Sequence, residues 1–181
     1  MKYFITLFFI SMFINAQGQL IDHSGWKTYF DNEFFFSFSY PPNWEFHDDV
    51  KNTKCMIFAP SYEGQKFRAQ IGMTAFELPP SSQNTNIKDF AETSFGQLRK
   101  MMKDCRVMVA KDVSEDGIQK FLVVANGLLN GKYVYVKQLY SIYNHVAYII
   151  DYTGEAGIKD PYAIIAGDIL NSLKPQKMTR Q

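Results

Sequence analysis

The sequence is poor in the residues that most often carry chemistry. Of its 181 residues, only two are cysteines and three are histidines. It holds no Cys-x-x-Cys, glycine-rich phosphate loop, Gly-x-Ser-x-Gly or His-Glu-x-x-His motif, which are the patterns of redox and zinc sites, nucleotide sites, serine hydrolases and zinc proteases. We therefore expect a protein that is not an enzyme and that uses no cofactor. A hydrolase or metal-dependent enzyme with an unrecognised site is the weakest alternative.

An excess of charge of one sign is also missing. The chain has 19 Lys and Arg against 18 Asp and Glu. Without Lys2, which belongs to the N-terminal segment, 18 basic residues stand against 18 acidic ones. A neutral domain has no bulk attraction for nucleic acid or for an anionic membrane surface. We therefore expect no nucleic-acid partner.

Long apolar runs are absent except at the N-terminus. Residues 1–18 combine Lys2, an apolar stretch over residues 3–14, and small residues around Ala16 and Gly18. This is the pattern of a secretory signal peptide, and the apolar stretch is shorter than the ~20 residues of a membrane span. We expect cleavage after Ala16 or Gly18 and an exported mature protein, periplasmic or extracellular, without a membrane span. An uncleaved N-terminal anchor is the alternative.

The two cysteines, Cys55 and Cys105, both follow the predicted signal peptide. An oxidising compartment permits a disulfide between them, and closing so long a loop would stabilise the fold by ~4 kcal/mol in the chain-entropy model. The distance between their Cα atoms cannot be read from sequence. Two unpaired thiols are therefore an equal alternative.

Aromatic residues and prolines, by contrast, give a clear local signal. Over residues 34–39, Phe34, Phe36 and Phe38 alternate with Phe35, Ser37 and Ser39, and Pro41 and Pro42 follow Tyr40. The alternation has the period of a strand, and the prolines end it because they lack backbone donors. We expect Trp44, which comes next, to cover the end of a core, since an indole buries much apolar area.

Two further segments have the apolar period of a helix. Residues 87–102 carry an apolar stripe, with Asn86 placed as the N-cap. A second helix is expected to begin at Asp160 and Pro161 and to end before Pro175.

The remaining pattern is that of strands joined by tight turns. The strands are expected at residues 56–59, 67–76, 106–111, 118–128, 132–142 and 146–152. Asn130 and Gly131 are the strongest hairpin signal, because a type I′ turn needs positive φ at both central positions. Consecutive hairpins imply a mainly antiparallel sheet, which two amphipathic helices can cover, one on each face. We predict an α+β fold, an α/β/α sandwich, over residues 34–173. Residues 19–33 are expected to be a flexible lead-in, and residues 174–181 a disordered tail.

Two short motifs within this order of elements resemble those of a known family. They are residues 36–44 (FSFSYPPNW) and residues 169–173 (ILNSL). The chain resembles the PsbP-like family, in its Mog/PsbP-type sandwich, as an exported bacterial-type member, and the resemblance covers residues 34–173. It implies an α/β/α sandwich around an antiparallel sheet and a role in binding or assembly. It supplies no catalytic set to transfer.

Tyrosines crowd the two strands at residues 132–142 and 146–152. Tyrosine suits half-buried sheet positions, so the simpler interpretation is that these rings line the sheet beneath the helices. The functional interpretation is an exposed patch for a partner, because tyrosine is enriched at interfaces. The candidate partner-binding residues are Tyr133, Tyr135, Tyr140, Tyr143 and Tyr148.

The histidines do not suggest a metal site. His47 precedes Asp48 and Asp49, but neighbouring residues rarely all face one ion, and we expect a solvated loop after Trp44.

The sequence thus predicts an exported, non-catalytic protein-binding or assembly factor with an envelope or secreted protein as its partner. The alternative is a small-ligand or lipid carrier with a pocket between helix and sheet, suggested by the bulky residues Phe90, Phe95, Met101 and Met102.

Overall fold

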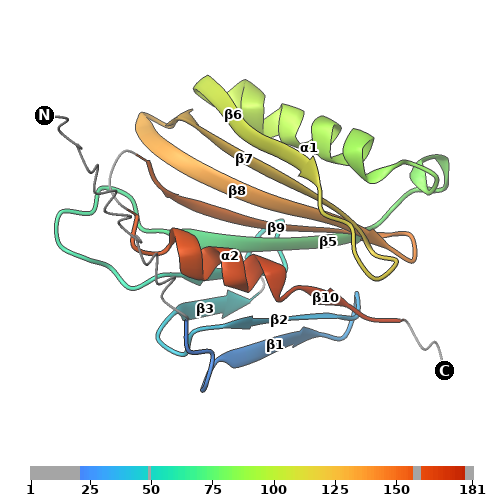
Figure 1. The fold of residues 1–181 in the computed structure, drawn as a ribbon, viewed down its shortest axis with the longest axis horizontal. Helices are drawn as coiled ribbons and strands as arrows, with labels where there is room; N and C mark the ends of the chain where they lie inside the picture. Colours follow the sequence, from blue (N-terminus) through green and yellow to red (C-terminus); the bar gives the residue numbers. More distant parts are fainter. Residues whose placement is uncertain (1–20, 49, 157–159, 178–181) are drawn as a thin grey trace, which may run out of the picture.

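The computed structural model describes residues 21–48, 50–156 and 160–177. The predicted signal peptide and Asp49 lie outside this part of the chain. A large sheet forms the central layer, helix α1 covers one of its faces, and helix α2 covers the other together with a small second sheet (Figure 1). We refer to the two faces of the central sheet as its α1 side and its α2 side.

The central sheet has seven strands, each antiparallel to its neighbours. In spatial order they are β3 (Glu45–Asp48), β4 (Cys55–Phe58), β5 (Gln70–Glu77), β9 (Val146–Glu155), β8 (Lys132–Tyr143), β7 (Gln119–Leu129) and β6 (Lys103–Asp112). The predicted antiparallel sheet is confirmed. Strand β3 lies where a loop was expected, and this prediction was wrong because β3 pairs along its whole length with β4.

The hairpin turns follow the predicted chemistry. Asn130 and Gly131 have φ values of 50° and 77° between β7 and β8, which confirms the predicted turn. Asn144 and His145 have φ values of 50° and 62° between β8 and β9. Positive φ at both central residues matches the right-handed twist of the flanking strands, so these two turns help to set the register of β7, β8 and β9.

The small sheet corrects both predicted ends of the domain. It consists of β1 (Lys27–Asp31), β2 (Phe36–Tyr40) and β10 (Lys174–Pro175), with β2 in the middle. β1 falls inside the predicted flexible lead-in, and β10 opens the predicted disordered tail. β1 is held by full antiparallel pairing with β2 and by the ring of Tyr29, which lies 5.5 Å from that of Phe38 between centroids.

Helix α1 (Ile87–Met101) starts where the sequence predicted. The Asn86 side-chain oxygen accepts a hydrogen bond from the Asp89 backbone N–H at 2.9 Å, which is the expected N-cap. A short 3₁₀ turn, η1 (Pro80–Ser82), precedes it. The buried residues of α1, Ile87, Ala91 and Phe95, face the sheet.

Helix α2 (Ala163–Asn171) begins slightly later than expected. The Asp160 carboxylate accepts a hydrogen bond from the Tyr162 backbone N–H at 2.9 Å and so forms a turn ahead of the helix. Trp44 is buried and its ring meets that of Tyr162 edge-on, which confirms that it closes one end of the core.

Candidate functional site

The predicted tyrosine patch is not present on the surface. Successive residues of a strand face opposite sides, so Tyr140 lies on the α1 side with the core beneath α1, while Tyr148 lies in the core of the α2 side. Each of these two side chains is only 1% exposed. The Tyr148 hydroxyl donates a hydrogen bond to the Phe34 carbonyl at 2.9 Å. The prediction that Tyr140 and Tyr148 contact a partner was therefore wrong.

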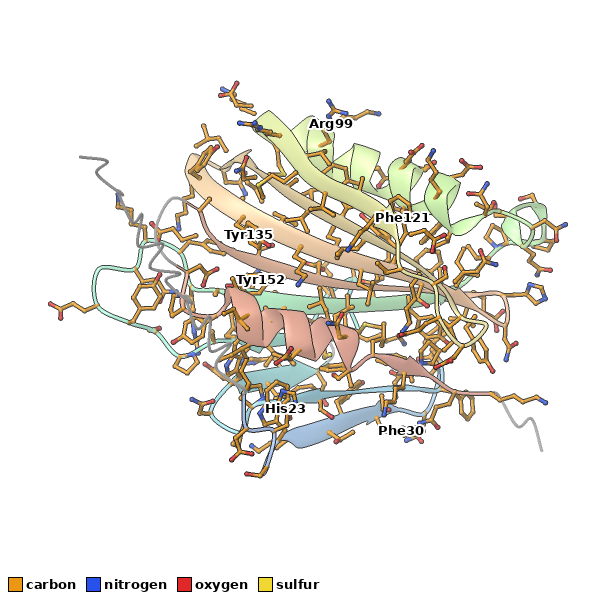
Figure 2. All side chains as sticks on the ribbon, viewed as in Figure 1. His23, Phe30, Arg99, Phe121, Tyr135 and Tyr152 are labelled. Carbon is orange, nitrogen blue, oxygen red and sulfur yellow. The ribbon has the colours of Figure 1, made fainter. Side chains whose placement is uncertain are left out.

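The other three tyrosines share the α2 side of β8 but differ in exposure. Tyr135 packs against Tyr152, with ring centroids 6.4 Å apart (Figure 2), and Tyr143 is half-buried against the same core. Tyr133 is 46% exposed, which makes it the one candidate of the five that is open to solvent. These rings mainly line the sheet, as the simpler interpretation proposed.

The two cysteines do not form a disulfide. Cys55 lies on β4, the second strand of the sheet, and Cys105 lies on β6, the seventh. Five strand spacings of about 4.8 Å separate them, far beyond disulfide reach. Burial raises the pKa of the Cys55 thiol to about 12, so this thiol stays protonated and is no nucleophile at neutral pH.

His47 also lies outside any metal-binding arrangement. Its Nε2 is 2.8 Å from a Glu45 carboxylate oxygen on the exposed edge strand β3. Over the described residues, no group of three or more His, Cys, Asp or Glu side chains converges as metal ligands would.

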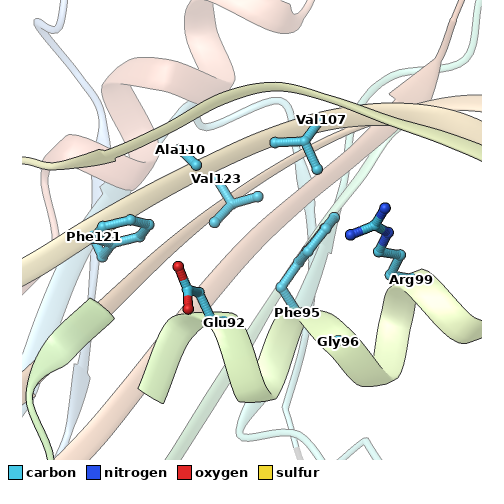
Figure 3. Close-up of a pocket in the computed structure, with 8 residues that line it drawn as sticks. All are labelled: Glu92, Phe95, Gly96, Arg99, Val107, Ala110, Phe121 and Val123. Carbon is cyan, nitrogen blue, oxygen red and sulfur yellow. The ribbon is translucent and has the colours of Figure 1, made fainter. Parts of the chain in front are cut away.

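A hollow with converging side chains lies between α1 and the strands β6 and β7 (Figure 3). We call it the α1–β6 groove; its volume is about 320 Å³. It is lined by Glu92, Phe95, Gly96 and Arg99 from α1 and by Val107, Ala110, Phe121 and Val123 from the strands.

The floor of the α1–β6 groove is apolar. Phe95 and Val123 are buried at its base, while Val107 on β6 is 38% exposed. At Gly96 no atom lies within 4 Å of the place that a Cβ would take, so the missing side chain widens the groove on its helix side. An exposed valine beside an open apolar floor is the arrangement of a surface that binds an apolar group.

The two charged residues of the groove stand at its opposite ends. Glu92 lies toward Phe121, and Arg99 lies toward Val107 (Figure 3). The Glu92 carboxylate has one weak ion pair with Lys88, at 3.8 Å on the same helix. The Arg99 guanidinium pairs with no residue in the described part of the chain. Both charges are therefore available, and a guanidinium binds carboxylates in a fixed two-bond geometry.

Strand β6 adds a backbone edge beside the groove. It is the last strand of the sheet and pairs only with β7 among the described strands. Its pairing slips twice, between Lys103 and Arg106 and between Val107 and Val109. Irregularities of this kind limit unselective strand addition, while the free N–H and C=O groups of an edge can still bind an extended peptide.

Of the groove residues, sequence reasoning named only Phe95, for the carrier alternative, and it also missed Asp151. This aspartate lies on β9, within the apolar run at residues 146–152. Burial raises the pKa of its carboxyl to about 7. An acidic residue inside an otherwise apolar strand was the available signal. Glu92 and Arg99 look in the sequence like the ordinary solvated face of a helix.

Comparison with known proteins identifies the fold. No protein-family model matches this sequence, and no curated protein matches it either. Among solved structures, cyanobacterial PsbP (CyanoP) from Synechocystis aligns with a TM-score of 0.63 at 13% identity, covering 90% of this chain and 99% of that one. The yeast Ran-binding protein Mog1p aligns with a TM-score of 0.60 at 9% identity, covering 83% and 95%.

A third similar structure is LpqN, which is involved in cell envelope biogenesis of Mycobacterium tuberculosis. It aligns with a TM-score of 0.53 at 12% identity, covering 83% of this chain and 84% of that one. The chain therefore has the PsbP/Mog-like fold that its motifs resembled. Neither helix in the described part of the chain is long and apolar enough to cross a membrane.

Proposed function

We propose that this protein is an exported, non-catalytic binding or assembly factor that holds an extended segment of a partner protein in the α1–β6 groove. The observation that carries the proposal is the groove itself, an apolar floor with an available carboxylate at one end and an available guanidinium at the other. Mog1p, which has a similar fold, is a Ran-binding protein. The fold is thus compatible with protein binding, although a fold alone does not define function.

The spacing of the two charges defines the segment that would fit. Glu92 and Arg99 are seven residues apart on α1, which is about 10.5 Å along a helix. Three or four residues of extended chain span about 10 to 13 Å. A basic and an acidic residue four positions apart would lie on the same side of a strand, with the residue midway between them also on that side. We expect that middle residue to be apolar and to fill the groove.

The proposal that the protein is exported rests on its N-terminal sequence. Residues 1–18 have the charge, apolar stretch and small residues of a signal peptide. We therefore expect the partner to be an envelope or secreted protein.

Selection of peptides from a random displayed library on the purified protein tests this function. The proposal predicts enriched peptides that carry an apolar residue between an acidic and a basic one. Arg99→Glu should replace the acidic preference by a basic one, because the recognising charge is reversed. Lys100→Glu is the matched control: it makes the same change of charge on the next residue, which does not line the groove, and should leave the selected sequences unchanged. Equal effects of the two variants, or no enrichment, would refute the proposal.

A carrier of small apolar ligands is the second candidate. The groove lies between a helix and the sheet, as that hypothesis requires, and Phe95 lines it. Met102 is buried elsewhere, and Met101 is exposed on the outer face of α1. Native mass spectrometry of the protein purified from its own cells separates the two candidates. A bound apolar compound that is lost in Gly96→Leu, which fills the groove, would favour the carrier.

A further inference from the structure

Half of the α1 side of the central sheet is not covered by α1. The helix packs mainly on β6, β7 and β8, and no other helix or sheet in the described part of the chain covers β4, β5 and β9 on this side. Along these strands the residues of the α2 side, such as Ile57, Ile71 and Ile150, are fully buried. The residues between them are partly open to solvent, except Gly72, which is buried. We call them the open half-face: Met56, Phe58, Gln70, Gly72, Thr74, Ile149 and Asp151.

Asp151 occupies the middle of the open half-face. It pairs with Gly72 on β5 and with Gln138 on β8, in continuous registers without a bulge. Its Oδ1 lies over Gly72, where an added Cβ would come within 2.9 Å of it. A side chain at position 72 would therefore have to displace the carboxylate. A glycine inside a regular strand is otherwise unfavourable; here it leaves room for a carboxylate of the neighbouring strand.

The Asp151 carboxylate has no partner among the described residues: no hydrogen bond or ion pair joins it to them. The neighbouring Gln138 side-chain oxygen accepts a hydrogen bond from the Tyr140 hydroxyl instead. Burial is the one cause that raises the Asp151 pKa, so no cation is near enough to lower it.

Three charged or titratable side chains near the β3 edge of this side, Glu45, His47 and Arg68, are engaged with one another. The Arg68 guanidinium lies 2.7 Å from a Glu45 carboxylate oxygen, and the His47 ring pairs with the same carboxylate at 2.8 Å. Arg68 also lies over the Phe58 ring. These groups balance their own charges at the β3 edge and leave Asp151 uncompensated.

Apolar surface adjoins the carboxylate along the same strands. Thr74 and Ile149 are paired in register next to the pair formed by Gly72 and Asp151. Further along, Phe76 is 37% exposed and packs against Phe90 of α1 beside a second hollow of about 380 Å³. A ligand with an aliphatic stem and a cationic head would find apolar contact for the first and a counter-ion for the second.

We propose that the open half-face binds a lysine or arginine side chain of the partner protein, with the Asp151 carboxylate as the counter-ion of its charged head. The inference rests on the proposed function only for the source of the cation. The open half-face would then be a second contact surface, on the same side of the sheet as the α1–β6 groove. Binding of a cation would also explain the unpartnered Asp151 carboxylate, which packing alone does not explain.

Titration with n-butylammonium, which mimics a lysine side chain, tests this site without any partner. Binding is followed by the NMR signal of the Asp151 carboxyl carbon, with n-butanol as the neutral control. Because the carboxyl must be ionised to bind a cation, the affinity should rise about tenfold between pH 6 and pH 8. Asp151→Asn should abolish binding at both pH values. His47→Gln should leave the pH dependence of the affinity unchanged. This result would exclude protonation of the His47 ring as the cause of that dependence.

An affinity that does not change with pH, or that survives in Asp151→Asn, would overturn the inference. Gly72→Ala provides a second variant in which the carboxylate remains but is displaced, and it should weaken binding of the cation at least several-fold. The groove-filling Gly96→Leu should bind n-butylammonium as the parent protein does. If the selection enriches no peptide but n-butylammonium binds as predicted, the proposed peptide binding in the α1–β6 groove is refuted. The proposed cation site at Asp151 is then still supported.

Discussion

The two sides of the central sheet are covered in different ways. On the α2 side, a helix and the three-stranded sheet enclose a core in which Phe36, Tyr148 and Tyr152 are almost completely buried. On the α1 side, one helix covers half of the sheet and leaves the α1–β6 groove and the open half-face. The difference shows that one face of the sheet carries the more enclosed core, and we propose that the other serves for contacts.

This division also explains the aromatic content of the chain. Aromatic residues make up 16% of the sequence, and sequence reasoning offered two interpretations of the tyrosines among them, a lining of the sheet and an interface. The structure places 13 of the 24 aromatic residues in its described part within or against the core of the α2 side, where the Phe36 ring meets that of Tyr148 on the central sheet. The small sheet needs many large side chains because its three strands cannot bury much surface by themselves.

The largest expected effect compares two phenylalanines on the two sides. Phe36→Ala should lower the free energy of unfolding by about 3 to 5 kcal/mol, because it leaves a closed cavity. Phe95→Ala should cost only about 2 kcal/mol, because the space opens into the groove and water can enter it. Urea denaturation measures both. Equal losses would contradict the view that the α1 side is the less enclosed.

The next largest expected effect is a change of stability with pH. We expect it to distinguish Asp151 from the other carboxyls. Its pKa is raised from an ordinary value of 3.8 to about 7, so between these values the folded state binds more protons than the unfolded state. Stability should therefore fall as pH rises from about 4 to about 7, by roughly 2 to 4 kcal/mol from this group.

Asp151→Asn provides the comparison for that prediction. It should be more stable than the parent protein at pH 8 and similar to it at pH 4. The difference between the two denaturation curves isolates Asp151 from exposed carboxyls such as Glu45 and Glu115, whose pKa values are lowered by their partners. A difference that is constant across this range would show that the carboxyl is solvated.

A smaller effect compares a buried tyrosine hydroxyl with an exposed one. Tyr148→Phe should cost about 1 kcal/mol, because the Phe34 carbonyl loses its hydrogen-bond donor inside the core. Tyr133→Phe should change stability by less than about 0.5 kcal/mol, since its side chain faces solvent. Thermal unfolding of the two variants decides the matter, and a larger loss for Tyr133 would reverse our assignment of the tyrosines.

The smallest expected effect on stability lies in the groove. Arg99→Glu and Lys100→Glu should each change the free energy of unfolding by less than about 0.5 kcal/mol, because both side chains lie on the surface of α1. Circular dichroism during heating provides the measurement. A marked loss for Arg99→Glu alone would mean that this residue supports the fold, and its effect on peptide selection would then lose its meaning.

Local chemistry predicted much of the fold. The cap at Asn86, the turn at Asn130 and Gly131 and the stop at Pro41 each depend on the conformation of a few neighbouring residues, so the sequence is sufficient to predict them. β1 and β10 were missed because their stability comes from pairing with β2, which lies far away in the chain in the case of β10.

The candidate site was much less predictable. Whether a tyrosine faces α1 or α2 depends on register, and a shift of one residue reverses it. The groove depends on where α1 sits across the strands, and Asp151 matters only because Gly72 lies beside it in space. The interpretation that Cys55 and Cys105 form a disulfide was wrong for the same reason, because the strand order places the two residues far apart.

The most direct test of the division between the two sides is site-specific photo-crosslinking in the cells that make this protein. A photoreactive residue is placed at Val107 or Phe76 on the α1 side, and at Ile164 or Phe30 on the α2 side, all positions with exposed side chains. We predict a defined crosslinked partner from Val107 and Phe76 only, reduced by Arg99→Glu but not by Lys100→Glu. Equal crosslinking from Ile164 and Phe30 would contradict the account.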